Sequence, residues 1–310
     1  MIVELFAAAA LAAAPVERPL TAPGPQGQLA GTLADAGKGA PVVLIIPGSG
    51  PTDRDGNNPL GVTAAPYRLL AEALARRGIS SVRIDKRGMF GSKAAIPDAN
   101  KVTIADYAAD AHAWVASARE ATGAKCVWVL GHSEGALVAL TAGQKPDGIC
   151  GVITVAGAGR KLGAVMREQL KANPANAPIL QPAMAALDSL EAGKPVDNAG
   201  LPAPLQPLFN PAVQPFLIDL LAQDPAKLAG SLRSPLLIVQ GEKDIQVSDE
   251  DAKLLAGAQT KAKVAVLPGV NHVLKTVASD DRGANLATYA DPSLPIAPSV
   301  VEAVAGFVKP

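Results

Sequence analysis

Short, continuous apolar segments alternate with helical patterns along most of this 310-residue chain. Strands are expected at 42–46, 79–84, 126–130, 149–155, 236–239 and 263–267. Segments that are apolar at every position suit strands with both faces buried, as in parallel sheets covered by helices. The glycine-rich segment 27–33 is expected to add an antiparallel strand at one edge. This alternation predicts an α/β fold, with a mostly parallel central sheet flanked by helices.

Three of the intervening helices have recognisable ends. One begins at Pro66 and is expected to continue through Arg77 to Gly78. A second is predicted at 103–123, because Thr103 and Asp106 have the spacing of a capping pair. The last helix is expected to start with a capping box formed by Ser299 and Glu302, which stand three residues apart near the end of the chain.

Residues 158–230 differ from the rest of the chain, because strand patterns are lacking there and prolines separate short amphipathic pieces. The segment is too long for an ordinary connection and too apolar for a disordered linker. We expect a helical cap insertion that packs over one end of the sheet and covers the pocket. The predicted organisation is therefore a leader at 1–20, an α/β core at 21–157 and 231–310, and the insertion at 158–230.

The first 14 residues are apolar and end in alanines before Pro15, like the hydrophobic region and cleavage site of a secretory signal. A basic start is lacking and Glu4 is present, so a helical or disordered leader is the alternative interpretation. A signal peptide predicts a periplasmic or secreted protein, and its absence a cytoplasmic one. Since this stretch is too short to span a bilayer and no later run of 18 apolar residues follows, stable membrane insertion is not expected.

The two cysteines, Cys126 and Cys150, each stand at the beginning of a predicted strand. If those strands are parallel neighbours, both thiols lie at the same edge of the sheet and a disulfide is feasible. Two separate buried thiols are the slightly favoured interpretation, because strand pairing does not guarantee the geometry of a disulfide. No histidine ligands accompany the cysteines at zinc-site spacing, so no metal is expected.

The 28 basic and 28 acidic side chains cancel, which removes several classes of function. Nucleic-acid binding normally needs a surplus of basic residues to replace counterions at phosphates, and no such surplus is present. A disordered chain is also excluded, because 49% of the residues are hydrophobic and only 18% are charged. These numbers describe a folded protein with no ionic handle for a polyanionic partner.

Residues 131–135, Gly-His-Ser-Glu-Gly, match the G-x-S-x-G pattern that carries a nucleophilic serine. The pattern alone is weak, because glycine is common in this chain. Its surroundings strengthen it, since a predicted strand ends just before it and a helix-forming stretch follows it. A sharp turn between strand and helix would leave the hydroxyl accessible, so Ser133 is the expected nucleophile.

A serine hydroxyl needs a base within hydrogen-bond reach, and the chain has three histidines. His132 stands beside the serine and is expected to point elsewhere. His112 lies within the predicted helix 103–123, where it is expected to be partly exposed or packed in the core. His272 lies in a loop just after the last predicted strand, and is therefore the expected general base.

A carboxylate is expected to hold the imidazole in the required tautomer. Asp244 follows the strand at 236–239, at the carboxyl end where active-site loops gather, and is the predicted partner of the histidine. Glu242, Asp249 and Asp251 compete for this role. Asp249 and Asp251 are better suited to beginning the next helix, where acidic side chains are favoured.

The order Ser133, Asp244, His272 on strand and loop elements resembles the α/β-hydrolase fold, from about residue 28 to the end. Residues 46–57, IPGSGPTDRDGN, are similar to the oxyanion loop P-G-S-G-P-x-D-R-D-x-N of a bacterial esterase branch, whose relatives are dienelactone-hydrolase-like and serine-peptidase-like. Residues 83–92 resemble the family's D-x-R-G-x-G-x-S loop. The resemblance implies an oxyanion hole formed by the backbone N–H groups of Ser49 and Glu134.

Three charged residues, Asp53, Arg54 and Asp85, belong to these two loops. They could hold a charged part of a substrate. An internal ion-pair network that fixes the oxyanion loop is the favoured interpretation.

The resemblance implies a serine hydrolase of the carboxylesterase type that acts on a small neutral ester without cofactor or metal. A serine peptidase or thioesterase on the same triad is the alternative. An aminopeptidase would need acidic side chains near the nucleophile, for which Glu134, Asp188 and Glu191 are candidates. A non-catalytic binding protein is a more remote alternative, because such proteins usually lack a triad member.

Overall fold

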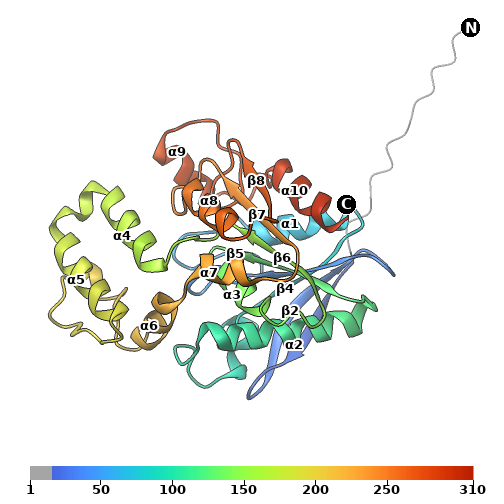
Figure 1. Ribbon diagram of the computed structural model, residues 1–310, viewed down its shortest axis with the longest axis horizontal. Coiled ribbons are helices and arrows are strands. Elements are labelled where there is room, and N and C mark those ends of the chain that lie inside the picture. The colour runs from blue at the N-terminus through green and yellow to red at the C-terminus, as the bar shows by residue number, and fades with distance from the viewer. Residues whose placement is uncertain (1–15, 310) are drawn as a thin grey trace, which may run out of the picture.

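A computed structural model describes residues 16–309, which form an eight-stranded sheet in the order β1-β2-β4-β3-β5-β6-β7-β8 (Figure 1). The sheet is antiparallel between β1, β2 and β4 and parallel from β4 to β8. The strands are β1 (Val16–Pro23), β2 (Gln28–Asp35), β3 (Val42–Ile46), β4 (Ser80–Ile84), β5 (Val127–His132), β6 (Ile149–Val155), β7 (Leu236–Gly241) and β8 (Lys263–Leu267). The predicted α/β fold with a mostly parallel sheet is confirmed.

Helices cover both faces of the sheet because the inner strands are apolar on both faces. In β3, Val43 and Ile45 point to the face covered by α1 (Pro66–Ala75) and α10 (Pro298–Val308), while Leu44 points to the other face. That second face is covered by α2 (Ile104–Thr122), α3 (Glu134–Ala142) and α8 (Asp249–Ala258). Two apolar cores, one on each side of the sheet, therefore hold the strands in place.

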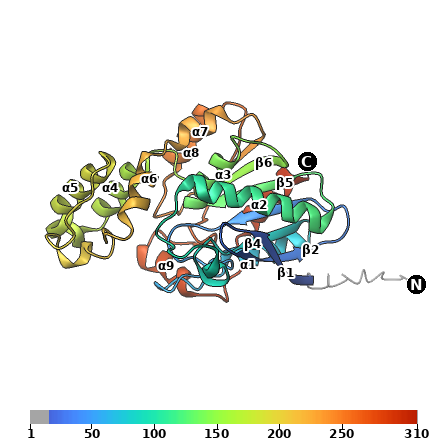
Figure 2. The same cartoon turned by 90° about the horizontal axis from the view of Figure 1, so that it is seen from below.

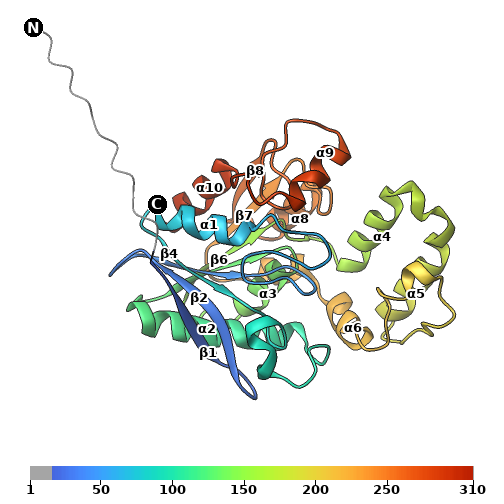
Figure 3. The same cartoon turned by 180° about the vertical axis from the view of Figure 1, so that it is seen from behind.

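The chain between β6 and β7 is helical and contains α4 (Leu162–Ala172), α5 (Leu180–Glu191), α6 (Gln214–Ala222), α7 (Pro225–Ser231) and the 3-10 turns η2 (Pro174–Ile179) and η3 (Ala203–Leu205). Helices α4 to α6, here called the helical segment, extend to one side of the sheet (Figures 1 to 3). They share a small apolar core of their own, which includes Leu187, Leu190 and Phe209. Helix α7 instead packs against α3 and α8 of the main body.

Hydrogen bonds near both of its ends fix the helical segment to the main body. Where the chain leaves β6, the backbone N–H groups of Gly159 and Arg160 and the Arg160 guanidinium all donate to Asp251, which is completely buried at the start of α8. At the other end, Asp219 of α6 accepts a hydrogen bond of 2.8 Å from the backbone N–H of Ile104 at the start of α2. The segment is thus held at both ends.

Two expectations at the chain ends were wrong. The leader was expected to end at residue 20, but β1 already begins at Val16. The sequence gives little sign of β1 because it is an edge strand whose residues are mostly exposed. The expected capping box of Ser299 and Glu302 does not form. Helix α10 begins at Pro298, whose ring already fixes the helical φ, and Glu302 faces Arg77 instead. The first 14 residues, on which the signal-peptide prediction rests, lie outside the described residues.

The remaining short elements are η1 (Phe90–Ala95), α9 (Arg282–Ala287) and η4 (Thr288–Ala290). Within residues 16–309, no helix has both the length and the apolarity that crossing a membrane requires.

Cys126 and Cys150 form a disulfide, so the favoured interpretation of two separate thiols was wrong. The register explains the bond, because Val127 pairs with Ile149 and the two cysteines therefore stand at the beginning of adjacent parallel strands. Their Cα atoms are 5.2 Å apart, within the range that a disulfide requires. The bond joins β5 and β6 at the edge of the sheet opposite to the carboxyl ends of the strands.

We predict that replacing both cysteines by serine lowers the free energy of unfolding by about 3 kcal/mol, because the bond closes a loop with a sequence separation of 24 residues. Urea denaturation of the oxidised protein and the double variant would measure this difference. Equal stability of the two proteins would contradict the prediction.

Candidate active site

Ser133 lies at the tip of a sharp turn between β5 and α3, where the sequence predicted it. Its φ of 54° is unusual for a residue with a side chain and marks a strained backbone. Glycines are required on both sides of it. A Cβ atom at Gly131 would lie 1.8 Å from the carbonyl oxygen of Gly135, and one at Gly135 would lie 2.4 Å from the carbonyl oxygen of Ile46. The turn therefore packs backbone against backbone and leaves the Ser133 side chain at the surface of a cavity.

Asp244 and His272 meet at the same edge of the sheet, after β7 and β8 respectively. The Nδ1 atom of His272 lies 2.7 Å from Oδ2 of Asp244. The other carboxylate oxygen of Asp244 accepts hydrogen bonds from the backbone N–H groups of Gln246 and Val247. Burial raises the pKa of Asp244, but His272 and these backbone donors outweigh it, so the pKa lies below its ordinary value. Asp244 is thus a buried, ionised partner of His272.

The competing carboxylates are engaged elsewhere or lie on the surface. Asp249 and Asp251 are at the start of α8, as expected from their sequence context. Asp249 pairs with Lys253, and Asp251 pairs with Arg160. Glu242 is exposed. Among the four candidates, Asp244 alone forms a hydrogen bond with His272.

A cavity of about 130 Å³ brings the predicted residues together, since its wall contains Ser49, Ser133 and His272. The other residues of the wall are Gly48, Thr52, Gly56, Asn58, Val62, Pro66, Tyr67, His132, Gln246, Val273 and Tyr289. With Nδ1 of His272 bonded to Asp244, Nε2 is the ring nitrogen available to Ser133. The described residues include no hydrogen bond between Ser133 Oγ and His272, a contact that commonly tightens only when substrate binds.

The backbone N–H groups of Ser49 and Glu134 are both placed to serve this cavity. Ser49 lies in its wall, and Glu134 follows Ser133 at the first position of α3, where helical N–H groups have no intrahelical partner. Neither N–H donates to another group in the described part of the chain. A Cβ atom at Gly48 would lie 3.3 Å from that of Ser133, which shows how closely the two loops approach.

The charged residues of the two loops form an internal network, as favoured from the sequence. Asp85 accepts hydrogen bonds from the backbone N–H and the guanidinium of Arg54, and from the backbone N–H of Gly91. Asp53 accepts from the backbone N–H groups of Asp55 and of Asn57, two and four residues further along the same loop. None of these charged side chains is in the wall of the cavity. Their observed contacts fix the loop that carries Ser49.

The expected roof over the cavity is not formed by residues 158–230. None of them belongs to the cavity wall. The helical segment reaches the wall indirectly, through a hydrogen bond from Gln169 of α4 to the backbone carbonyl of Gln246. Its own apolar core explains the difference, because the helices bury their apolar faces against one another instead of against the site.

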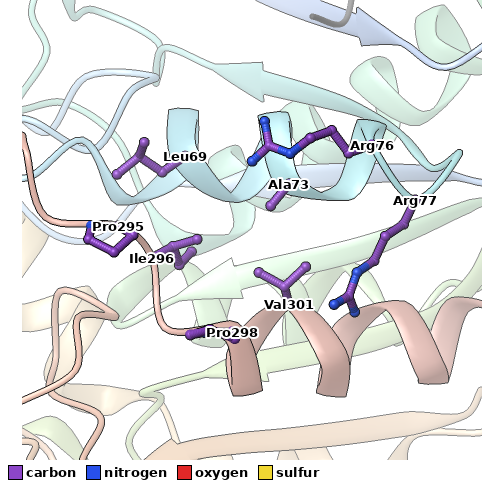
Figure 4. A pocket seen from close by; sticks show the side chains of 8 residues that line it. All are labelled: Leu69, Ala73, Arg76, Arg77, Pro295, Ile296, Pro298 and Val301. Atoms are coloured by element: carbon purple, nitrogen blue, oxygen red, sulfur yellow. The ribbon is translucent and has the colours of Figure 1, made fainter. Parts of the chain in front are cut away.

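A larger cavity of about 300 Å³ lies elsewhere, between α1 and α10 (Figure 4). Its wall contains the side chains of Leu69, Ala73, Ile296 and Val301, with Arg76 and Arg77 at one end. It shares no wall residue with the cavity at Ser133 and contains no carboxylate, thiol or imidazole. It lacks the groups that acid–base or nucleophilic chemistry needs.

Within residues 16–309, no cluster of three or more potential ligands could hold a metal ion.

We compared the sequence with models of known protein families. The model of the alpha/beta hydrolase family matches residues 42–287, which include Ser133, Asp244 and His272. The chain belongs to the alpha/beta hydrolase family. This hydrolase is also similar to Esterase EstD of Thermotoga maritima, with 29% identity over 271 residues. The match covers 83% of this chain and 60% of EstD, so the chain spans well under two thirds of that relative.

Solved structures of two esterases have the same fold as this chain. The esterase Pf2001 of Pyrococcus furiosus matches with a TM-score of 0.57 and 16% identity, over 84% of both chains. Est1E of Butyrivibrio proteoclasticus matches with a TM-score of 0.56 and 17% identity, over 93% of this chain and 99% of its own. At such identities the likeness concerns the fold alone.

Two residues of the hydrolase's site were missed or misjudged from the sequence. Tyr67, in the first turn of α1, was not singled out. Its hydroxyl accepts a hydrogen bond from the backbone N–H of Gly48 and lies 2.8 Å from Nδ1 of His132. The Nε2 atom of His132 lies 2.8 Å from the backbone carbonyl of His272. His132 therefore points between two loops of the site, whereas His112 lies half-buried on α2 as expected.

This arrangement suits a neutral His132. A carbonyl only accepts hydrogen bonds, so Nε2 carries the proton and Nδ1 accepts from the Tyr67 hydroxyl. Burial, together with the nearby His272, lowers the pKa of His132 to about 3. The two imidazole rings are 4.8 Å apart, so a charge on His132 would oppose protonation of His272.

We predict that His132 makes the hydrolase less stable as the pH falls. In the unfolded chain a histidine titrates near pH 6.5, so between about 6.5 and 3 the unfolded state binds more protons. Stability should therefore decrease with falling pH, by up to about 1.4 kcal/mol per pH unit from this residue.

Urea denaturation between pH 7 and 4.5 would measure this effect in the wild type and in His132→Asn. The wild type should lose roughly 2 kcal/mol more than the variant across this range. Equal pH dependence of the two proteins would show that folding does not lower the pKa of His132.

Proposed function

We propose that the protein is a serine carboxylesterase. Ser133 Oγ attacks the ester carbonyl while Nε2 of His272 takes its proton, and the same proton passes to the departing alcohol. Asp244 keeps His272 in the required tautomer and stabilises the imidazolium. The N–H groups of Ser49 and Glu134 stabilise the oxyanion. Water, activated by His272, then releases the acid from the acyl-enzyme.

The observation that carries this proposal is the 2.7 Å contact between Asp244 and His272 beside the cavity that Ser133 shares. It orients the imidazole, occupies Nδ1 and leaves Nε2 as the base. The strained backbone of Ser133 supports the same function, because strain of this kind gathers at active sites.

The proposed substrate is a small, neutral ester. None of the residues in the cavity wall is an aspartate, glutamate, lysine or arginine, so the wall offers no partner for a charged group. The volume of about 130 Å³ suits a short acyl or alcohol portion. The likeness to EstD supports ester hydrolysis, and the loop at residues 46–57 supports the assignment to the bacterial esterase branch.

The acidic residues that an aminopeptidase would need are engaged in ion pairs. Glu134 pairs with Lys86, while Asp188 and Glu191 both pair with Arg167. None of the three belongs to the cavity wall. This favours an esterase over an aminopeptidase, although a thioesterase would use the same atoms. The complete set of Ser133, Asp244 and His272 makes a non-catalytic binding protein the least favoured alternative.

The helical segment is proposed to influence the cavity only indirectly, through α4. Its link to the site is the hydrogen bond from Gln169 to Gln246, since Gln246 lies in the cavity wall and also bonds to Tyr289. A movement of α4 would thus be transmitted to the wall.

We predict that Ser133→Ala abolishes hydrolysis of p-nitrophenyl acetate and labelling by a fluorophosphonate probe. His272→Ala should lower kcat by about 10⁶-fold and Asp244→Asn by about 10⁴-fold, since the three residues act as one unit. Asp249→Asn is the matched control, because Asp249 was a competing candidate that lies on the surface of α8; it should keep wild-type activity. Substantial hydrolysis by Ser133→Ala would refute the proposed mechanism.

The same assay separates the alternative reactions. Short-chain p-nitrophenyl esters should be turned over faster than long-chain esters, and aminoacyl anilides should not be cleaved. Faster cleavage of an acyl-thioester than of its oxygen ester would favour the thioesterase instead.

We also propose that the protein is exported, on the basis of its apolar leader and the disulfide between Cys126 and Cys150. Disulfides persist in oxidising compartments and are rare in the cytosol. Mass spectrometry of the protein from its native host should show loss of the residues before Pro15 and bonded cysteines. An intact leader together with free thiols would refute export.

A further inference from the structure

A buried lysine contacts both sides of the proposed oxyanion hole. Lys86 lies in the loop after β4, and its Nζ atom donates hydrogen bonds to the backbone carbonyl of Gly48 at 2.7 Å and to Oε1 of Glu134 at 3.0 Å. The side chains of Lys86 and Glu134 are only 3% and 5% exposed. The ring of Tyr107 lies 5.3 Å from the ammonium. The charge is therefore enclosed and directed at two backbone segments.

The contact with Gly48 acts on the peptide group of the first oxyanion donor. The carbonyl of Gly48 and the N–H of Ser49 belong to one planar peptide unit and point in opposite directions. Fixing the carbonyl oxygen therefore fixes the direction of the Ser49 N–H. On the other side of Gly48, the Tyr67 hydroxyl accepts the Gly48 N–H at 3.1 Å. Both peptide groups around Gly48 are thus oriented by buried side chains.

The contact with Glu134 acts on the second donor. Glu134 supplies the backbone N–H that follows the nucleophile, and its side chain is held by the same ammonium. One cation thus connects the residues that carry the two donors. A hydrogen bond from an ammonium also polarises the peptide that accepts it, which strengthens the N–H at the other end of that peptide.

Stability alone is a weak reason for such a pair. Removing two charges from water costs several kcal/mol, and replacing a buried ion pair by apolar residues is often neutral or stabilising. The pair has a second role because Lys86 bonds both to the Gly48 carbonyl, next to the Ser49 N–H, and to the side chain of Glu134.

We propose that Lys86 is a positioning residue for catalysis, which orients and polarises the Ser49 N–H while holding Glu134 in place. This inference rests on the proposed esterase function. It assigns part of the transition-state stabilisation to a side chain that does not itself touch the substrate. Losing Lys86 should therefore weaken binding of the transition state more than binding of the substrate.

The test uses Lys86→Met together with Glu134→Gln, so that no unpaired charge remains buried. The matched control is Arg87→Met together with Asp110→Asn. That pair is also buried, at 8% exposure for each side chain, and Arg87 follows Lys86 directly in the sequence. Arg87 also pairs with the more exposed Asp106, and its contacts involve neither Gly48 nor Glu134. Active sites are counted by end-point fluorophosphonate labelling, so that misfolded protein does not enter the rates.

The Lys86 double variant should lose about 10- to 100-fold in kcat/KM for p-nitrophenyl acetate. Its affinity for a trifluoromethyl ketone, whose adduct oxygen occupies the oxyanion hole, should fall by the same factor. The control pair should keep both values within about twofold, whatever its loss of stability. Lys86→Gln in the Glu134→Gln background retains a neutral donor to Gly48 and should recover part of the lost activity.

Wild-type kcat/KM in the Lys86 double variant, or an equal loss in the control pair, would overturn the proposal. So would a loss of kcat/KM with unchanged affinity for the ketone. If the Lys86 double variant does not fold, the same two measurements are made on Lys86→Gln in the Glu134→Gln background, and wild-type values there would overturn the proposal. Failure of the proposed esterase function is a separate result, since it would appear as persistent hydrolysis by Ser133→Ala.

Discussion

The contact between the backbone of the serine turn and the end of β3 is the constraint around which the site is arranged. Gly135 leaves no room for a Cβ atom against the carbonyl of Ile46, and Gly131 leaves none against Gly135. This contact brings Ser133 next to Gly48, and hence next to the loop that supplies Ser49. The strand order then brings the loops after β7 and β8 to the same edge. The proposed nucleophile, its proposed base and carboxylate, and the two proposed N–H donors meet because β3, β5, β7 and β8 end on the same side of the sheet.

Several buried polar groups around this contact are paired with one another. The N–H of Gly48, the hydroxyl of Tyr67, the ring of His132 and the carbonyl of His272 form one chain of hydrogen bonds. That chain joins the oxyanion loop to the loop of the base. This chain of hydrogen bonds uses an uncharged His132 ring, so it connects the two loops without placing a cation beside His272.

Sequence patterns predicted most of the fold and the central residues of the site, because those signals are local. The inner strands are apolar at every position, and Ser133 stands in a short motif between a strand and a helix. Tyr67 carried no such signal, since its partner His132 lies 65 residues away. Lys86 was not singled out in the sequence either, because its proposed role depends on contacts 38 and 48 residues away along the chain. The disulfide and the position of the helices likewise depend on packing between distant segments.

The separate apolar core of the helical segment has a consequence for how the protein can diverge. Leu187, Leu190 and Phe209 pack among the helices themselves, and Arg160 and Asp219 fasten the segment near its two ends. Leu162, Phe216 and Leu220 are the exceptions, because they pack against the core of the main body. Substitutions elsewhere on the surfaces of α4 to α6 leave the packing of the sheet undisturbed. As long as those attachments are kept, the segment can be redesigned or exchanged as a unit. The surface next to the Ser133 cavity can then change while the residues of the cavity stay the same.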